Sequence, residues 1–525
     1  MLKTVIYTLR EKENLSQEKL AEILGVSRQA VQKWETGVSV PELSKIIEIS
    51  KYFGISLDTM LLGRTRRIVV DELKYKDIKP LYKNIHDWEF YASGIMDEYK
   101  QSTDEGLDIE QYKNLFEAVD KLPKDEIKND LANVLQKIVI NADIKKCYEY
   151  KEPSELTEIK ALRKEYSITK KDPKNLEDKI YGAWMGRICG CMLGKSVEGV
   201  RSDELIPFLK ETNNFPLHRY ILKSDITKEI SKKYNYDFMS RCYVDEIDGM
   251  PIDDDTNYTV LSQLIVDNYG RTFTPDNISK MWLKCQPKDA YCTAERVAFC
   301  NFVKGYMPPE SAVHKNPYRE WIGARIRGDY WGYINPGNPE LAAEMAWRDA
   351  SISHVKNGIY GEMFAAAMIA TAAVTNVLEE IILSGISQIP CTSRLYDSIT
   401  KILDYYKDGK SKKEVFEYIY DQYDEKSSYG WCHTIPNDMI VVASLLYGNG
   451  DFAKSICMAV ESAFDTDCNG ATVGSILGMA NGIKSIPPEW ASPMNDTLHT
   501  SIFGVGTLKI SDAAKKTMTH IPNQN

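Results

Sequence analysis

Glycine recurs at every fourth position of one segment, and this spacing constrains the fold more than any other feature of the sequence. The residues are Gly182, Gly186, Gly190 and Gly194. Residues four apart share one face of a helix, so the segment predicts a helix with one face that lacks side chains. Such a face lets another backbone or a ligand approach closely, and tight helix packing is the simpler interpretation. Packing alone does not explain the turn that follows, which presents Glu198.

The rest of the sequence also favours helices. Helix-length stretches with apolar residues on one face recur, and strands and helices do not alternate. The chain lacks a dinucleotide-binding glycine fingerprint, a Walker loop and a G-x-S-x-G elbow, which argues against the folds that use them. We therefore predict an all-α protein with a five-helix head at residues 1–67, a helical connector at 68–171 and a large helical domain at 172–525.

Charge is distributed unevenly along the chain. The whole chain has 65 Lys and Arg against 75 Asp and Glu, so it has no overall basic footprint for nucleic acid. Residues 1–67 hold 11 basic and 8 acidic residues, and the remainder holds 54 and 67. Eleven scattered cysteines without a C-x-x-C pair favour a reducing cytoplasm. The most apolar stretch, residues 363–374, is shorter than the roughly 20 residues of a membrane span, so no membrane association is expected.

The sequence of residues 1–62 predicts five short helices, with a helix-turn-helix pattern among them. Ser16 and Ser27 are expected to cap the second and third helices, with Gly25 in the turn between them. The polar residues of the third helix are Arg28, Gln29, Gln32 and Lys33. Arg and Gln can pair bidentately with guanine and adenine edges, which favours a recognition helix in the major groove. The alternative is a solvated face of a small protein-interaction bundle.

This head resembles the lambda-repressor-like, Cro-type helix-turn-helix family. The resemblance rests on residues 15–21, 24–27 and 31–37, with Pro41 and Leu43 extending it. It implies that residues 1–67 bind duplex DNA, usually as a homodimer. Gln17 would contact phosphate, and Ser27 would lie among the DNA contacts.

Two acidic clusters, each in front of a predicted helix, carry the chemical content of the large domain. They are Asp253-Asp254-Asp255-Thr256 and Asp465-Thr466-Asp467-Cys468. Adjacent carboxylates at a helix start repel one another more than the helix dipole stabilises them, unless a cation lies among them. Carboxylate oxygens are the ligands that Mg²⁺ and Ca²⁺ prefer. The clusters therefore predict a metal site if they meet, and a solvated acidic turn is the alternative for the first.

With the glycine-rich helix that ends in Glu198, these clusters resemble the ADP-ribosylglycohydrolase family, which includes the dinitrogenase reductase-activating glycohydrolase. Asp254-Asp255-Thr256, and Asp465-Thr466-Asp467 with Gly470-Ala471, match the family's T-D-D-T and D-T-D-x-x-G-A segments in order. The resemblance implies an all-helical domain that binds two Mg²⁺ ions, with Mn²⁺ as an alternative metal. Its reaction would be hydrolysis of the glycosidic bond of ADP-ribose attached to a protein or a small-molecule acceptor.

The resemblance also implies roles for individual residues. Glu198, Asp254 and Asp255 would form the catalytic group, with Glu198 near the scissile bond. The metal ligands would be Asp253, Asp254, Asp255, Asp465, Asp467 and Cys468. The residues near ADP-ribose would be Ser353, His354, Asn357 and Gly358. Three positions depart from the family pattern, because Asp253 and Cys468 replace threonines and Cys191 replaces an aspartate.

The sequence thus predicts a cytoplasmic, Mg²⁺-dependent ADP-ribosyl hydrolase joined to a sequence-specific DNA-binding domain. The main alternative is a transcriptional regulator whose hydrolase-like domain only senses ADP-ribose or a related nucleotide. In a third interpretation the head is a protein-docking module.

Overall fold

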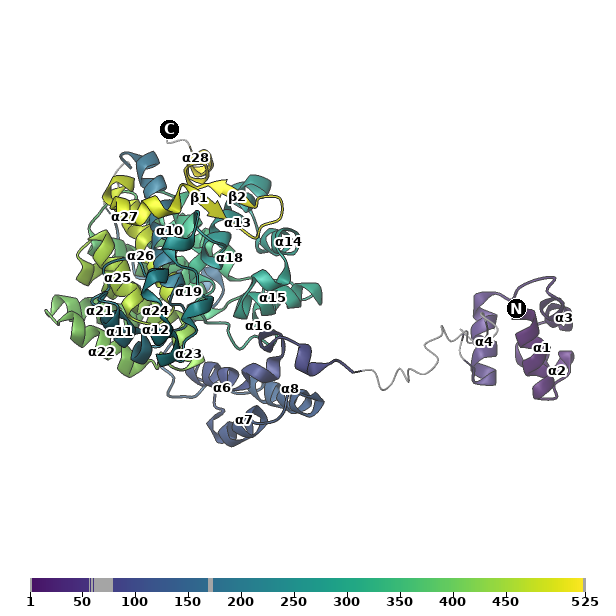
Figure 1. Cartoon of the computed structure of the whole chain (residues 1–525). Helices are drawn as coiled ribbons and strands as arrows, with labels where there is room; N and C mark the ends of the chain where they lie inside the picture. The colour runs from purple at the N-terminus through teal and green to yellow at the C-terminus, as the bar shows by residue number, and fades with distance from the viewer. Residues whose placement is uncertain (1, 56, 58–59, 61–78, 169–172, 523–525) are drawn as a thin grey trace. The chain divides into compact units, whose positions relative to one another are not determined.

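The structure, a computed structural model, describes residues 2–55, 57, 60, 79–168 and 173–522. The chain forms two compact units, Met1–Leu81 and Tyr82–Asn525. Both are built from helices, as predicted, and the described strands form one short hairpin (Figure 1). No helix in the described part of the chain is long and apolar enough to cross a membrane.

The first unit is a small helical bundle. Its helices are α1 (Leu2–Lys12), α2 (Gln17–Ile23), α3 (Arg28–Thr36) and α4 (Leu43–Phe53). Ser16 Oγ accepts a hydrogen bond from the Lys19 N–H at 3.1 Å, and Ser27 Oγ accepts one from the Ala30 N–H at 3.2 Å, so both predicted caps are confirmed. The fully buried core residues include Ile6, Leu20, Val31 and Ile49. The predicted fifth helix, at 56–62, falls mostly outside the described residues.

The second unit begins in the predicted connector and continues through the large domain. The connector contributes 3-10 turns η3 (Asp87–Glu89) and η4 (Tyr91–Gly94) and helices α6 (Ile95–Asp104), α7 (Lys113–Asp120), α8 (Glu126–Ile140) and α9 (Leu156–Ala161). The helices around the candidate site are α10 (Leu176–Lys195), α13 (Asp254–Tyr269), α21 (Arg394–Lys407), α23 (Ser428–Cys432), α24 (Thr434–Gly448) and α26 (Thr466–Asn481).

The remaining helices complete the second unit. They are α11 (Ser202–Glu211), α12 (Lys228–Lys233), α14 (Pro275–Cys285), α15 (Thr293–Val303), α16 (Glu310–Val313), α17 (Asp329–Tyr333), α18 (Pro339–Ala350), α19 (Lys356–Ala372), α20 (Leu378–Ile386), α22 (Lys412–Gln422), α25 (Phe452–Glu461), α27 (Pro488–Ala491) and α28 (Ile510–His520). Strands β1 (Thr497–His499) and β2 (Thr507–Lys509) pair antiparallel, with Leu498 opposite Leu508.

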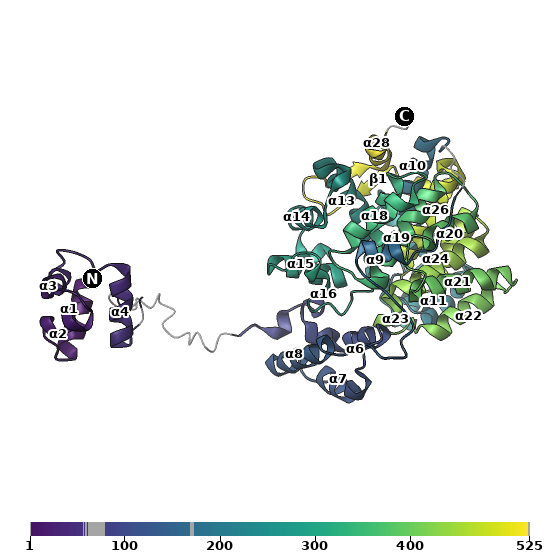
Figure 2. The same ribbon diagram turned by 180° about the vertical axis from the view of Figure 1, so that it is seen from behind.

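α10 and α26 touch through their backbones in the middle of the second unit (Figure 1 and Figure 2). A Cβ atom built on Gly190 would collide with the carbonyl oxygen of Gly470. The close pairs of this contact are Gly190 with Gly470, Gly186 with Gly474 and Gly182 with Gly478. The two helices therefore run antiparallel, and the glycine face predicted from the sequence packs against a second glycine face.

This antiparallel contact decides which helix ends meet. The end of α10 lies beside the start of α26, where the Thr466 hydroxyl donates a hydrogen bond to the Gly194 carbonyl oxygen at 2.9 Å. From the middle of α10, the buried Arg187 guanidinium donates to the Asp255 carboxylate at 3.0 Å and to the Thr259 hydroxyl at 2.9 Å. The start of α13 is thereby tied to the same place.

Buried ion pairs attach the connector to the rest of the second unit. The Arg319 guanidinium lies 2.9 Å from the Glu98 carboxylate and 2.7 Å from that of Glu105. The Arg394 guanidinium lies 2.8 Å from the carboxylate of Glu152. Removing one partner of such a buried pair leaves the other charge uncompensated, which costs about 3–5 kcal/mol. Residues 82–161 are therefore an integral part of this unit.

We predict that Gly190→Ala lowers the free energy of unfolding by about 4 kcal/mol or more, because its methyl group would force two backbones apart. Gly409→Ala is the matched control, since Gly409 has a positive φ of 73° but nothing within 4 Å of an added Cβ. The control should lose only about 1–2 kcal/mol, from backbone strain. Chemical denaturation of both variants measures the difference, and equal losses would contradict the close contact.

Candidate active site

Carboxylates from three helix ends meet where α10, α13 and α26 converge. They are Glu198 after α10, Asp253, Asp254 and Asp255 at the start of α13, and Asp465 and Asp467 at the start of α26. Potential ligand atoms of Cys191, Asp253, Asp255 and Asp467 all lie within 4.8 Å of one another, and those of Asp465, Asp467 and Cys468 do so too. The structure therefore brings together both acidic clusters that the sequence singled out. We call these six carboxylates the acidic cluster.

Crowding and burial shift the protonation of the acidic cluster. Burial, with repulsion from Asp253 and Asp467, raises the pKa of Asp254 to about 7. Burial raises the pKa of Asp255 well above its usual range. Repulsion from Asp467, followed by burial, does the same for the pKa of Glu198. The cluster thus holds more negative charge than its surroundings compensate.

Two cations contact the acidic cluster among the described residues. Arg187 reaches Asp255, and the Lys195 ammonium lies 2.7 Å from the Asp253 carboxylate. Sequence reasoning assigned neither of them a role. For Arg187 the available signal was an arginine inside residues 182–194, a stretch of α10 otherwise made of glycine and apolar residues, since a charge is placed there only with a partner.

Asp253 lies in one potential metal-ligand group with Asp255 and Asp467, and its carboxylate also has protein partners. Its Oδ2 faces Lys195, and its Oδ1 accepts a hydrogen bond from the Asp255 N–H at 3.0 Å, which caps α13. Burial alone would raise the pKa of Asp253, but the Lys195 ammonium outweighs it, so the pKa lies below its usual value. Both oxygens therefore already have partners, and Asp253 belongs to the cluster as an ionised, lysine-paired carboxylate.

Cys191 and Cys468, the two cysteines that depart from the family pattern, are buried, and their thiols lie beside the carboxylates. Cys468 Sγ lies 3.1 Å from Asp255 Oδ2, in hydrogen-bonding geometry. Burial raises the pKa of both the Cys468 and the Cys191 thiol well above the usual value. At neutral pH they are thiols rather than thiolates, and neutral sulfur is a poor ligand for a hard ion.

A cavity of about 610 Å³, which we call the cleft, lies next to the acidic cluster. Its lining residues are Asp87, Trp88, Ser93, Asp97, Lys128, Arg201, Thr293, Tyr318, Trp321, Lys426, Ser428, Trp431 and Cys432. Trp431 joins it to the cluster, because its indole N–H donates a hydrogen bond at 2.8 Å to the carbonyl oxygen of Phe464, the residue directly before Asp465. The first five residues belong to the predicted connector, so that segment forms one wall of the cleft.

Two buried hydrogen-bond donors of the cleft have no partner in the described part of the chain. They are Trp321 Nε1 and Arg201 Nη1. The Arg201 guanidinium lies over the Trp431 ring, 4.7 Å from its centre. A buried donor without an acceptor costs about 1–3 kcal/mol, so these two groups fit an oxygen-rich ligand.

The residues expected near ADP-ribose are buried and contact one another or neighbouring charged residues. The Ser353 hydroxyl and His354 Nδ1 hydrogen-bond to each other at 2.8 Å, and Arg327 donates to Ser353 at 3.1 Å. The Asn357 amide donates to the Glu152 carboxylate at 2.8 Å. Gly358 packs against the Arg319 carbonyl oxygen. None of the expected four is among the residues that line the cleft.

The head presents most of its predicted DNA contacts to solvent. Ser27, Arg28, Gln29, Gln32 and Lys33 are all exposed around the start of α3. The Arg28 guanidinium pairs with Glu18 at 2.6 Å on the same surface.

Gln17 differs from the other predicted contacts. It is half-buried, and its amide donates to Glu35 at 2.8 Å. The Glu35 carboxylate also pairs with Arg10 at 2.6 Å, and neither of these two residues was assigned a role from the sequence.

Comparison with known proteins separates the two units. The curated relatives are HTH-type transcriptional regulators. The chain is 37% identical over 89 residues to the HTH-type transcriptional activator BcrR of Enterococcus faecalis, which covers 17% of this chain and 40% of BcrR. It is 33% identical over 64 residues to the SPbeta prophage-derived HTH-type transcriptional regulator YonR of Bacillus subtilis, which covers 12% of this chain and 59% of YonR. The chain thus spans about half the length of these relatives.

The second unit matches a different family. A solved structure described as an ADP-ribosylglycohydrolase-related protein complex aligns with a TM-score of 0.41 at 16% identity, over 66% of this chain and 98% of that one. The sequence model named Helix-turn-helix matches residues 6–60, and the ADP-ribosylglycohydrolase model matches residues 172–520. Because this last match covers more than half of the chain, the protein belongs to the ADP-ribosylglycohydrolase family and carries a helix-turn-helix domain ahead of it.

Proposed function

We propose that the second unit hydrolyses the glycosidic bond between ADP-ribose and an acceptor, using divalent cations held by the acidic cluster. The observation that carries this proposal is the surplus of carboxylates where three helix ends meet, including the buried Asp467 Oδ1, which lacks a hydrogen-bond partner among the described residues. Buried carboxylates without counter-charges are unfavourable, so the cluster favours bound cations. Oxygen ligands fit Mg²⁺, and Mn²⁺ would fit the same set.

The residues that would hold the ions are Asp254, Asp255, Asp465 and Asp467, and the family resemblance favours two ions. When bound, such ions stabilise developing negative charge and lower the pKa of a bound water to about 7. Asp253 would add negative charge while Lys195 holds it in place. Cys468 would sit at the edge of the set, where its thiol donates to Asp255.

Glu198 is the residue that we assign to proton transfer. Because repulsion from Asp467 and burial raise the pKa of Glu198, its carboxyl group keeps a proton at pH values where an ordinary glutamate has lost it. A protonated carboxyl group next to the scissile bond can donate that proton to the leaving group.

The cleft would hold the nucleotide part of the substrate. Arg201 Nη1 and Trp321 Nε1 would donate to diphosphate oxygens, which satisfies both orphaned donors. The Trp88 and Trp431 rings offer faces on which adenine could stack. Ser353, His354, Asn357 and Gly358 would act by holding the buried charged residues that they contact.

The head would bind duplex DNA through Ser27, Arg28, Gln29, Gln32 and Lys33, usually as a homodimer. Gln17 would support α3 through Glu35. The protein would then be a DNA-bound hydrolase that acts on an ADP-ribosylated protein or small molecule. The second candidate is a sensor that binds ADP-ribose without cleaving it, and the replacement of metal-site oxygens by the Cys191 and Cys468 thiols favours it.

We predict that Mg²⁺ raises the melting temperature more at pH 8 than at pH 5.5. Because the pKa of Asp254 is raised to about 7 in the folded protein, its contribution to stability is lost as pH rises through that value. A bound cation offsets the repulsion that appears at high pH. Scanning fluorimetry at constant ionic strength measures both shifts.

Two variants test whether the acidic cluster causes the Mg²⁺-dependent shift in melting temperature. Asp254→Asn combined with Asp467→Asn should abolish the Mg²⁺ shift. Lys195→Met should enlarge it, because the competing ammonium on Asp253 is removed. A wild-type protein that shows no shift at either pH would refute the metal site.

We predict that the wild type releases ADP-ribose from an arginine-, serine- or nucleotide-linked substrate, and that Glu198→Gln lowers kcat by about 10²–10⁴-fold. Binding of free ADP-ribose and the Mg²⁺ shift should persist in this variant, since the side chains of glutamine and glutamate are nearly isosteric. Chromatographic detection of ADP-ribose and calorimetric titration measure the two properties. Binding without release by the wild type would favour the sensor instead.

We predict that Arg28→Ala and Gln32→Ala reduce discrimination between DNA sequences by about 1–3 kcal/mol per lost base contact. Lys51→Ala, which changes an exposed lysine on α4, should weaken binding to all sequences alike or leave it unchanged. Gel retardation with genomic fragments at several salt concentrations measures both effects, because phosphate contacts make affinity fall with salt. No retention by the intact protein at low salt would instead support the docking interpretation.

A further inference from the structure

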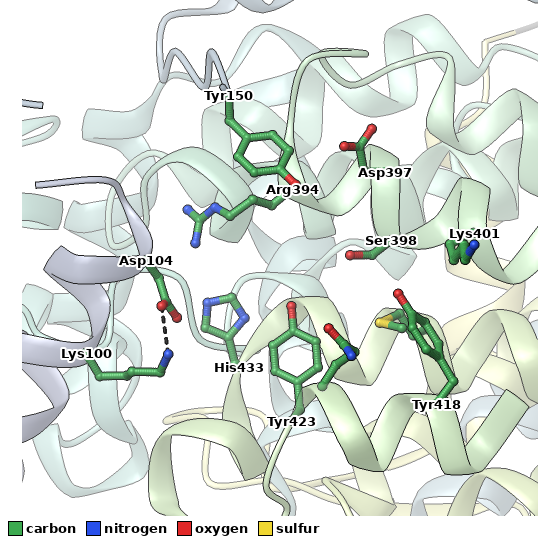
Figure 3. A pocket seen from close by; sticks show the side chains of 12 residues that line it. Lys100, Asp104, Tyr150, Arg394, Asp397, Ser398, Lys401, Tyr418, Tyr423 and His433 are labelled. Carbon is green, nitrogen blue, oxygen red and sulfur yellow. Dashed lines mark hydrogen bonds and ion pairs between the residues drawn. The ribbon is translucent and has the colours of Figure 1, made fainter. Parts of the chain in front are cut away.

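A second cavity, of about 520 Å³, lies close to the cleft but is separate from it (Figure 3). Trp431 and Cys432 line the cleft, whereas the next residue, His433, lines the second cavity. α6 also lines both cavities, because Asp97 lies in the wall of the cleft and Lys100 and Asp104 lie in the wall of the second cavity. Its size is within the range of small-molecule sites. The function proposed above does not use it.

His433 gives this cavity a buried ring nitrogen that makes no hydrogen bond within the described residues. The side chain is only 1% exposed, and Figure 3 shows its imidazole between Asp104 and Tyr423. His433 Nδ1 accepts a hydrogen bond from the Ile435 N–H at 3.2 Å, so the ring proton lies on Nε2. His433 Nε2 has no hydrogen-bond partner within the described residues, and the nearest carboxylate oxygen, Glu320 Oε2, is 3.6 Å away.

The charges around the cavity are already balanced. The Lys100 ammonium lies 2.8 Å from the Asp104 carboxylate. The Arg394 guanidinium is held by Glu152 and Glu320, each at 2.8 Å. Of the remaining lining residues, Lys401 and Asp397 carry opposite charges. No surplus of positive charge is left among the described lining residues to hold a phosphate group, so the wall suits an uncharged ligand.

The rest of the wall suits a planar ring. Tyr150, Tyr418 and Tyr423 line the cavity, and the Tyr423 ring stacks on the imidazole of His433 with an interplanar angle of 20°. Ser398 and Gln422 add neutral donors and acceptors. Aromatic faces with a few neutral polar groups are typical of sites that bind uncharged heterocycles.

We propose that this cavity is a second ligand site, which takes an uncharged nucleoside-sized molecule with a planar heterocycle and a carbonyl oxygen. The carbonyl oxygen accepts the hydrogen bond from His433 Nε2, and the ring packs on the tyrosines. The hydroxyl groups of the ligand bind to Ser398 and Asp397.

The test titrates the full-length chain with guanosine, inosine, uridine and cytidine, and with the 5′-monophosphate of each, by calorimetry. At least one nucleoside should bind with a Kd of about 1 mM or lower, and its monophosphate should bind at least tenfold more weakly. If none of the four nucleosides binds with a Kd of about 1 mM or lower, the proposal is overturned. Tighter binding of the monophosphate would overturn it too, because it contradicts an uncharged site.

Three variants locate the bound nucleoside. Ser398→Trp fills the cavity and should abolish binding, while Asp404→Trp adds the same bulk to an exposed position of α21 and should leave it unchanged. His433→Phe keeps a ring but removes the donor, and should weaken binding at least tenfold. Binding that survives Ser398→Trp but is lost in Arg201→Ala would place the nucleoside in the cleft and overturn the proposal.

Discussion

The contact between α10 and α26 is made by main-chain atoms, and this determines how close the ends of the two helices come. Side chains in a contact can change rotamer, but two backbones that already touch can only separate or stay. Gly194 at the end of α10 therefore stays beside Thr466, and the acidic residues that follow each of them share one small volume. Arg187 brings α13 to the same point, since its guanidinium donates to both Asp255 and Thr259.

The acidic cluster is therefore held together against its own repulsion. Lys195 compensates Asp253, but the carboxyl groups of Asp254 and Glu198 have raised pKa values, and so does that of Asp255 in spite of its contact with Arg187. A folded chain keeps such an arrangement when the surrounding structure is strong enough to impose it, which is common at functional sites. The glycine contact supplies that strength here.

Short-range patterns in the sequence were sufficient to predict the helical fold, the capping serines Ser16 and Ser27, and the two acidic helix starts. Their period or order is visible in consecutive residues. Pairings between distant residues were not visible, such as Glu98 with Arg319, which lie 221 positions apart. For the same reason the sequence did not reveal that Lys195 holds Asp253, or that Arg327 donates to Ser353. Which partner a buried charge finds depends on the packing of whole helices.

The buried pairs of Arg319 and Arg394 with connector glutamates bear on how such a fusion can arise. The family match begins at residue 172, yet three of the four carboxylates that pair with these arginines lie before it, at Glu98, Glu105 and Glu152. A gene fragment cut at the family boundary would remove these three counter-charges from two guanidinium groups inside the protein. A junction that exchanges the DNA-binding head and keeps all three pairs must lie before Glu98, so the connector from that point on belongs to the fold of the hydrolase-family domain.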